Sequence, residues 1–304
     1  MEGAFIGRGR SYYDPEERRQ YEIETLQLNF WHVTDKDILE LSEKDHGQFH
    51  SGATYVVRWK YKVSLTGKTL KGLPSKHVAV GRERWAYFFW HGSESKAAEQ
   101  GLSALMTVEL DEEKGPQIRV EEGQEHAVFL NLWKGGMAIH KGRRDGQKGQ
   151  KRLYFVKGEY PEEACAVQVD CKEDSLRSRG CFVLFNGAKA TIWLGKGLPE
   201  HKKAVVDSLR ENWCDLKTAA GIAIEHEGQE SEAFKTALAF GNEDGLYYSN
   251  LTAPNSSMRL YQMTSVSGEF EVHEVVCPFL NSEKANVMSF NQADLYKAEQ
   301  PGNF

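Results

Sequence analysis

The chain has 304 residues, which at about 150 residues per domain predicts two domains. Hydrophobic residues make up 40% and aromatic residues 11%, which excludes wholesale disorder. The formal net charge of −6 argues against a dedicated nucleic-acid binder, and no segment reaches the roughly 18 apolar residues of a membrane-spanning helix. The five scattered cysteines do not suggest a disulfide framework, and the N-terminus lacks the apolar core of a secretory signal, so we expect a cytoplasmic chain.

Two sets of predicted elements follow one another in the same order. In the first set, apolar alternation predicts strands at 23–33, 52–57 and 86–90. Apolar residues at helical spacing then predict a long helix at about 95–110, and a short helix follows Glu122. The second set consists of strands at 153–156, 164–169, 180–185 and 190–193, a long helix at about 199–214 and a short helix after Glu227.

Three short motifs recur in the same order at nearly constant spacing. The sequence Glu-Gly-Gln-Glu recurs after 105 residues, Trp-x-Gly after 103 and Arg-Leu-Tyr after 107; their first copies begin at Glu122, Trp90 and Arg152. Such self-similarity indicates repeats. We predict a polar leader (1–21), a first repeat (22–144), a second repeat (145–252) and an incomplete third repeat (253–304), because a third Trp-x-Gly would fall near the end of the chain.

Together these motifs resemble the gelsolin/villin superfamily. The resemblance rests on Gly47-Gln-Phe-His-Ser-Gly-Ala-Thr-Tyr-Val, on Trp-x-Gly before the long helix, on Leu110-Asp-Glu-Glu at its end and on 135–142. It covers nearly the whole chain and implies an α+β fold of tandem gelsolin-like repeats, each with a central mixed β-sheet between one long and one short helix. It also implies that the repeats match the fourth, the fifth and the beginning of the sixth repeat of the family.

The resemblance implies one calcium ion per repeat, held by a Gly-Asp pair at a strand start, a glutamate of the long helix and a backbone carbonyl. In the first repeat the pair reads Gly52-Ala53, and the helix glutamate is Glu99. Calcium takes about six to eight oxygen ligands, and the anionic ones contribute much of the affinity. Losing one of two carboxylates therefore leaves at best a weak site.

The later repeats depart further from the calcium pattern. The second repeat reads Gly180-Cys181 at the pair and Lys202 on the helix, and a shift of one or two residues would bring His201 or Glu200 to that position. The third reads Ala285-Asn286, again without the acid. We therefore expect calcium binding to be weak or lost, no cofactor, and a calcium-insensitive protein.

The long helix of the first repeat carries a candidate actin contact. The resemblance implies that the first and fourth repeats of the family bind actin through this helix, with a calcium ion shared with actin. The corresponding residues here are Leu102, Leu105 and Val108, with Asp111 at the shared metal. The alternative is that this stripe faces the repeat's own sheet or a neighbouring repeat, because apolar helix stripes are usually core.

Two basic segments interrupt the acidic chain. An insertion at 58–84, expected to project as a hairpin or loop, carries Arg58, Lys60, Lys62, Lys68, Lys71, Lys76, Arg82 and Arg84 against the single acid Glu83. The connector between the repeats carries Lys141, Arg143, Arg144, Lys148, Lys151 and Arg152. These bases suit phosphoinositides, another anionic membrane surface or an acidic protein, at about 1 kcal/mol per base near a membrane. The alternative is a pair of solvated loops.

No catalytic motif is present: the sequence has no P-loop, G-x-G-x-x-G or G-x-S-x-G. Our leading interpretation is a non-enzymatic interaction module of the actin cytoskeleton, in a membrane-linked scaffold at the cytoplasmic face of the plasma membrane, without filament severing. Its partners would be actin or actin-associated proteins and an anionic membrane surface, not nucleic acid. The alternative is an actin-binding filament regulator that uses the long helix of the first repeat.

Overall fold

The computed structural model describes residues 8–14, 19–65, 81, 83–110, 115–146, 151–240, 260–264 and 271–275. The chain forms two compact units. The first comprises Met1–Lys148, Lys157–Ala166 and His201–Thr218, and the second comprises Gly149–Val156, Val167–Glu200 and Ala219–Phe304. Segments 157–166 and 201–218, which the sequence assigns to the second repeat, thus belong by their contacts to the first unit. Among the described residues, no helix has the length and apolarity needed to cross a membrane.

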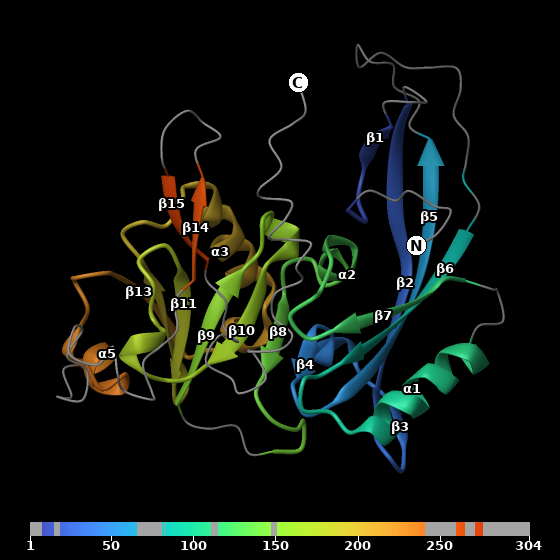
Figure 1. Ribbon diagram of the computed structural model, residues 1–304, viewed down its shortest axis with the longest axis horizontal. Coiled ribbons are helices and arrows are strands. Elements are labelled where there is room, and N and C mark those ends of the chain that lie inside the picture. The colour runs from blue at the N-terminus through green and yellow to red at the C-terminus, as the bar shows by residue number, and fades with distance from the viewer. Residues whose placement is uncertain are drawn as a thin grey trace. The chain divides into compact units, whose positions relative to one another are not determined.

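A mixed sheet of long, aromatic-rich strands forms the centre of the first unit (Figure 1). Its order is β1-β2-β5-β6-β7, with β3 paired to β2. The strands are β1 (Tyr12–Asp14), β2 (Arg19–Val33), β3 (Ile38–Glu40), β5 (Thr54–Leu65), β6 (Glu83–His91) and β7 (Gln117–Glu121). β7 runs parallel to β6, whereas the other neighbours are antiparallel. The short strands β4 (Gln48–His50) and β8 (Met137–His140) pair in parallel.

Helices cover both faces of this sheet. α1 (Ala97–Leu110) packs Met106 into a cluster that includes Val56 and the partly buried Phe89. α2 (Ala127–Asn131) packs through Phe129, whose ring centroid lies 5.5 Å from that of Phe88. Because successive residues of a strand point to opposite faces, Phe88 and Phe89 contact different helices. The sheet therefore lies between a long and a short helix, and the predicted α+β class is confirmed.

The flanks of the basic insertion extend the sheet. β5 runs on to Leu65 and β6 begins at Glu83, which pairs with Lys62, so both flanks of the insertion belong to the antiparallel pair of β5 and β6 (Figure 1). Trp59 and Tyr61 are buried on one side of it, with ring centroids 4.1 Å apart. Residues 66–80 and 82 of the insertion lie outside the described residues.

The leader expected to be polar contains a strand. Residues 12–14 pair with the start of β2, and the rings of Tyr12 and Tyr21 stack 5.2 Å apart across the two strands. A three-residue strand is too short to produce a periodic pattern, and this pairing depends on the cross-strand tyrosines rather than on alternation.

The second unit contains a sheet in the order β13-β12-β11-β9, with β13 parallel to β12. Its core gathers Phe155, Phe182, Trp193 and Phe234, the last from the short helix α5 (Glu232–Ala237). The strands are β9 (Lys151–Lys157), β11 (Cys181–Asn186), β12 (Lys189–Leu194) and β13 (Gly221–His226); β10 (Cys165–Val169) begins in the first unit and ends in the second.

The predicted long helix at 199–214 is interrupted. α3 (His201–Asn212) ends before Trp213, which has an extended backbone and a fully buried indole that donates to Oε1 of Gln48 at 3.3 Å. α4 (Cys214–Lys217) follows. The short 3-10 turns are η1 (Glu43–Asp45), η2 (Pro161–Glu163) and η3 (Glu173–Ser175).

The recurring motifs make the same hydrogen bonds in both repeats. The indole of the Trp-x-Gly motif donates to the second glutamate of Glu-Gly-Gln-Glu, at 3.1 Å for Trp90 and Glu125 and 3.0 Å for Trp193 and Glu230. The first glutamate accepts the backbone N–H of the residue after Trp-x-Gly, at 2.7 Å for Glu122 and Ser93 and 2.8 Å for Glu227 and Lys196. The two motifs therefore recur together because they are hydrogen-bonded to each other.

Little of the predicted third repeat can be compared with the structure. β14 (Leu260–Thr264) and β15 (Glu271–Val275) form an antiparallel hairpin. The rest of 253–304, including Ala285 and Asn286, lies outside the described residues. The incomplete third repeat, like the other repeat boundaries, stays a prediction.

Candidate functional site

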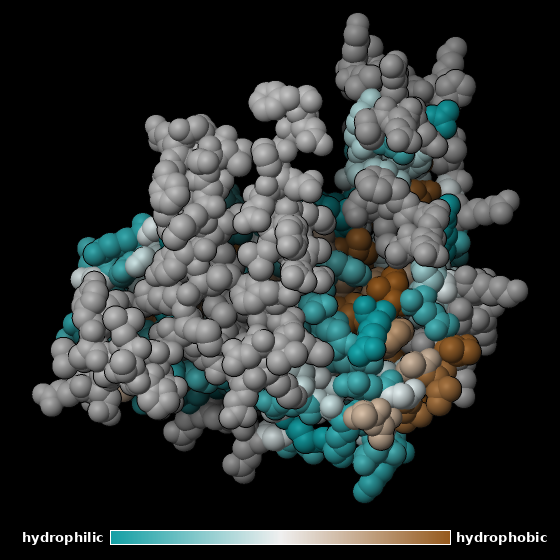
Figure 2. Space-filling model, viewed as in Figure 1, coloured by the Kyte–Doolittle hydropathy of each residue, from teal (hydrophilic) through white to brown (hydrophobic). Residues whose placement is uncertain are grey.

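One face of α1 is apolar and exposed. Leu105 and Val108 are 63% and 61% exposed, and the exposed Ala98 and Gly101 precede them at helical spacing. Apart from the neighbouring residues and the backbone of α1 itself, no described atom lies within 4 Å of the position that a Cβ would take at Gly101. In Figure 2 apolar surface gathers over α1. Contiguous exposed apolar side chains of this kind indicate an interaction surface.

The opposite face of α1 is fixed to the sheet. Met106 is buried, and Oγ of Ser103, which is fully buried, lies 3.1 Å from Nε2 of His91. Leu102, partly buried, packs at the margin of the same core. The predicted alternative, a stripe facing the repeat's own sheet, therefore does not describe Leu105 and Val108. Asp111 lies outside the described residues.

At the first turn of α1, Glu99 points inward and is paired with an arginine. Its side chain is 1% exposed, and Oε1 lies 3.2 Å from Nη2 of Arg143 and 3.9 Å from Nζ of Lys96. Gly52 donates its N–H to the carbonyl of Gly142 at 2.9 Å, and a Cβ at Gly52 would lie 3.0 Å from Cγ of Arg143. Gly52, Glu99 and Arg143 therefore lie close together in the first unit, and we call the place where they meet the Glu99 corner.

This corner does not fit the calcium ion that the family resemblance implies. Ala53 offers a methyl group where the resemblance implies aspartate, and the remaining carboxylate, Glu99, already contacts the guanidinium of Arg143. Oε2 of Glu99 is buried without a hydrogen-bond partner among the described residues, but one carboxylate oxygen beside a cation is not a calcium ligand set. In the part of the chain that the structure describes, no cluster of three or more His, Cys, Asp or Glu side chains could hold a metal.

Neighbouring groups favour a neutral histidine beside this corner. Burial lowers the pKa of His32, and the positive charges of Arg144 and Arg143 lower it further. Arg144 is itself held by Asp45, with Nη2 2.8 Å from Oδ1. Burial of Asp45 opposes its ionisation, but hydrogen bonds from Ser42 and Arg144 keep its pKa below the usual value. The positive charges here are thus supplied by arginines of the chain.

The pair of residues that the resemblance assigns to calcium in the second repeat shifts by one residue relative to the sequence alignment. Gly92 donates its N–H to the carbonyl of Ala53 at 3.0 Å, and Gly195 donates in the same way to Gly180 at 3.1 Å. Gly180 therefore corresponds to Ala53, and the pair equivalent to Gly52-Ala53 is Arg179-Gly180 rather than Gly180-Cys181. The sequence match failed because it aligned the two glycines, whereas the strand hydrogen bonds set the register.

The predicted helix position of the second repeat also has a partner of its own. Nζ of Lys202 donates to the carbonyl of Gly158 at 2.5 Å and lies 3.0 Å from Oε2 of Glu159. Cys181 is buried in β11, and burial raises the pKa of its thiol and of the Cys165 thiol. Neither thiol is therefore suited to metal binding or nucleophilic chemistry.

Several bases of the two basic segments make contacts within the fold. The guanidinium of Arg58 lies 5.5 Å and 5.2 Å from the ring centroids of Trp31 and Trp85, and Lys60 pairs with Glu83 at 2.6 Å. The guanidinium of Arg152 lies over Phe185, and Arg143 and Arg144 are paired as described above. Lys62, Arg84, Lys141 and Lys151 also lie in the described ranges, whereas Lys68, Lys71, Lys76, Arg82 and Lys148 do not.

No protein-family model matches the chain. It is 38% identical to supervillin of Bos taurus over 324 aligned residues, which cover 100% of this chain and 15% of supervillin. It is 31% identical to cytoplasmic gelsolin of Homarus americanus over 250 residues, which cover 77% of this chain and 30% of that gelsolin. The chain belongs to the gelsolin/villin superfamily. Within the superfamily it is also 27% identical to the actin depolymerising venom protein gelsolin 1 of Platymeris rhadamanthus, with 80% of this chain and 66% of that protein covered.

The superfamily resemblance found in the sequence is thus confirmed, and the chain spans a minority of the length of supervillin and of the lobster gelsolin. Sequence reasoning located Glu99 but missed its partner. Arg143 is 44 residues away and was counted only as one base of a loop. No motif marks this pairing, because it depends on how the end of β8 meets the start of α1.

Proposed function

We propose that this chain is a non-enzymatic actin-binding module that contacts actin through the exposed face of α1 and does so without calcium. The observation that carries the proposal is the exposure of Leu105 and Val108 on a helix whose other side is fixed to the core. Similarity to gelsolins, and to a venom protein whose name describes actin depolymerisation, supports actin as the partner.

The chemistry of this face suits insertion into an apolar cleft. A helix that presents apolar residues at successive turns is a common ligand for hydrophobic grooves. Burying each of two aliphatic side chains contributes about 1.5–3 kcal/mol. Because the core already fixes the helix, binding need not order it first, which reduces the entropic cost of association.

Calcium independence is supported by the contact between Arg143 and Glu99. A ligand shifts a conformational equilibrium only if it binds one state more tightly than another. The described residues offer no calcium ligand set through which calcium could bind one state more tightly. We therefore propose attachment to actin within a scaffold, without calcium-triggered severing. The whole-chain similarity to supervillin agrees with a module of a larger protein, because the chain spans 15% of that protein's length.

A second proposed contact is with phosphoinositides or another anionic membrane surface, which would place the module at the cytoplasmic face of the plasma membrane. Its support is the composition of the basic insertion, which contains eight basic residues and one acidic residue. Since Arg58 and Lys60 are engaged within the fold, the contact would use Lys68, Lys71 and Lys76. Changing these three to Glu should abolish co-sedimentation with phosphoinositide vesicles, and unchanged binding would reject this contact.

Co-sedimentation with actin filaments tests the main proposal. The double variant Leu105→Ser/Val108→Ser should bind at least about tenfold more weakly, because two apolar contacts are lost. Ile224→Ser is the matched control, since Ile224 is an aliphatic residue 53% exposed on β13. Wild-type binding should be equal with calcium and with a chelator. Full binding by the double variant, or binding only with calcium, would contradict the proposal.

A further inference from the structure

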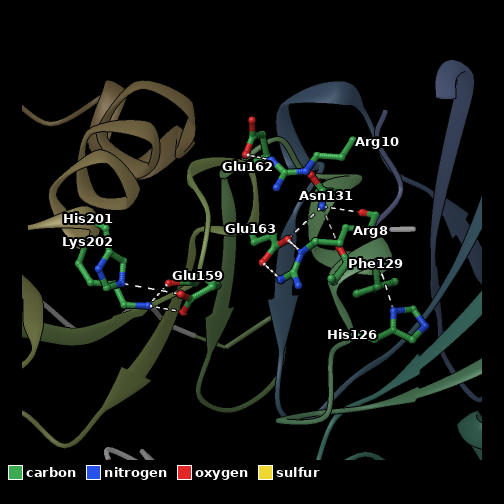
Figure 3. Close-up of polar contacts among 12 residues, drawn as sticks. Arg8, Arg10, His126, Phe129, Asn131, Glu159, Glu162, Glu163, His201 and Lys202 are labelled. Carbon is green, nitrogen blue, oxygen red and sulfur yellow. Dashed lines mark hydrogen bonds and ion pairs between the residues drawn. The ribbon is translucent and has the colours of Figure 1, made fainter. Parts of the chain in front are cut away.

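The Arg-Gly-Arg segment at residues 8–10 is bound by the folded part of the first unit (Figure 3). Nε and Nη2 of Arg8 donate to Oε1 and Oε2 of Glu163, both at 2.6 Å. This bidentate geometry is the strongest arrangement of an arginine with a carboxylate. The side chain of Glu163 is 2% exposed, so the carboxylate has left water and depends on its partner.

The second arginine uses different groups of the same surface. Nη1 of Arg10 donates to Oε2 of Glu162 at 2.9 Å. The guanidinium carbons of Arg8 and Arg10 lie 4.7 Å and 4.4 Å from the ring centroid of Tyr160. Both arginines therefore combine an ion pair with a cation–π contact to one aromatic ring, and planar guanidinium groups suit this better than ammonium groups.

The residue between the two arginines has to be glycine because of its own backbone conformation and the backbone of α2 beside it. Gly9 has φ of +82°, and a Cβ there would lie 3.3 Å from Cα of Val128 in α2. Nδ2 of Asn131, also in α2, donates to the carbonyl of Arg8 at 2.7 Å. A side chain at position 9 would meet both an unfavourable φ and the helix backbone. All three residues of Arg-Gly-Arg are thus selected by contacts.

A neighbouring carboxylate is already neutralised. Glu159 is paired with Lys202 at 3.0 Å and lies 3.8 Å from Nε2 of His201 (Figure 3). The hydrogen bond and charge of Lys202 lower the pKa of Glu159. Glu162 and Glu163 are therefore the carboxylates that face the arginines.

We propose that this surface is a binding site for Arg-Gly-Arg peptides, occupied in cis by residues 8–10. We call Arg8, Gly9 and Arg10 the clasp, and Val128, Asn131, Tyr160, Glu162 and Glu163 the acceptor surface. A ligand attached to the same chain binds at high effective concentration, so another Arg-Gly-Arg segment binds only when the clasp is released. The site uses none of the residues of the α1 face and is independent of actin binding.

A labelled peptide with the sequence of residues 7–13 tests the site by fluorescence anisotropy. The full-length variant Arg8→Ala/Arg10→Ala should bind it at least about tenfold more tightly than the wild-type chain, because the acceptor surface is vacant. Adding Glu163→Gln should abolish that binding, whereas adding Glu232→Gln, an exposed carboxylate of α5, should not. A peptide with lysine in place of both arginines should bind more weakly.

Amide hydrogen exchange of the wild-type chain tests the same site without any substitution, so it is informative even if the variants unfold. Excess peptide should displace the clasp and speed amide hydrogen exchange at residues 8–14, while the lysine peptide should not. Folded variants that fail to bind the peptide would overturn the proposal. Exchange at 8–14 that is unaffected by excess peptide would overturn it as well.

Discussion

At the first turn of α1, the guanidinium of Arg143 balances the charge of buried Glu99. Arg143 is 40% exposed, so its own desolvation is partial, whereas Glu99 is almost fully removed from water. The pairing therefore matters more to the glutamate than to the arginine. Removing Arg143 should leave the buried carboxylate with only the more distant Lys96, which is more costly than losing an exposed ion pair.

Arg143→Met retains an apolar stem and removes the guanidinium, and it should lower the free energy of unfolding by about 3 kcal/mol. Adding Glu99→Gln should restore most of this loss, because the buried group is then neutral. Urea unfolding measures both effects. Arg119→Met, at a pair in which Arg119 is 60% exposed, should change stability by less than about 1 kcal/mol. Equal effects of the two arginine substitutions would refute the pairing.

His126 provides a residue-scale test of pH dependence. Burial lowers the pKa of His126, and its Nδ1 accepts the N–H of Phe129 at the start of α2. A group whose pKa is lowered by folding binds fewer protons in the folded state, so its contribution is complete above the unfolded pKa of about 6.5 and is lost as pH falls below it. At the equivalent position, Ser231 caps α5 by accepting the N–H of Phe234.

His126→Ser should therefore keep the cap and remove the titrating group. The free energy of unfolding of the variant should fall less between about pH 7 and pH 5 than that of the wild type. Denaturant unfolding across this pH range measures the difference, and parallel curves for His126→Ser and the wild type would contradict the argument.

At the scale of elements, the repeats could be predicted because their signature residues hold one another. Trp90 and Glu125 must both be present to make one hydrogen bond, so they recur together and are visible in sequence. The register of the second repeat could not be predicted in this way. It is set by the carbonyl of Gly180, and any residue supplies a carbonyl. The clasp was missed for a related reason, since the acceptor of Arg8 lies 155 residues away.

The Trp–Glu hydrogen bond can be tested in the second repeat. Glu230→Ala leaves the indole of Trp193 and the N–H of Gly228 without their acceptor. It should lower the free energy of unfolding by about 2 kcal/mol. Glu232→Ala, two residues later, removes only a carboxylate that is 89% exposed, and should cost less than about 1 kcal/mol. Thermal unfolding of the two variants measures the contrast. Equal losses would mean that the recurring glutamate does not stabilise the repeat.

At the scale of the whole molecule, the attachment of α1 bears on the proposed independence from calcium. The helix is attached through Met106 and Ser103, and its charged end is neutralised by Arg143. The helix face is thus exposed while the chain itself supplies the positive charge in the corner. If this arrangement replaces calcium, then two substitutions that restore an acid and remove the arginine should create a calcium response.

The wild-type melting temperature should accordingly be the same with calcium and with a chelator. Ala53→Asp/Arg143→Ser should be less stable in chelator, because two carboxylates then share a buried corner, and calcium should raise its melting temperature by several degrees. At a calcium concentration 100 times the dissociation constant, binding contributes about 2.7 kcal/mol. Ala53→Asn/Arg143→Ser is the matched control without the second charge and should respond less. A micromolar calcium response of the wild-type chain would refute the replacement of calcium by Arg143.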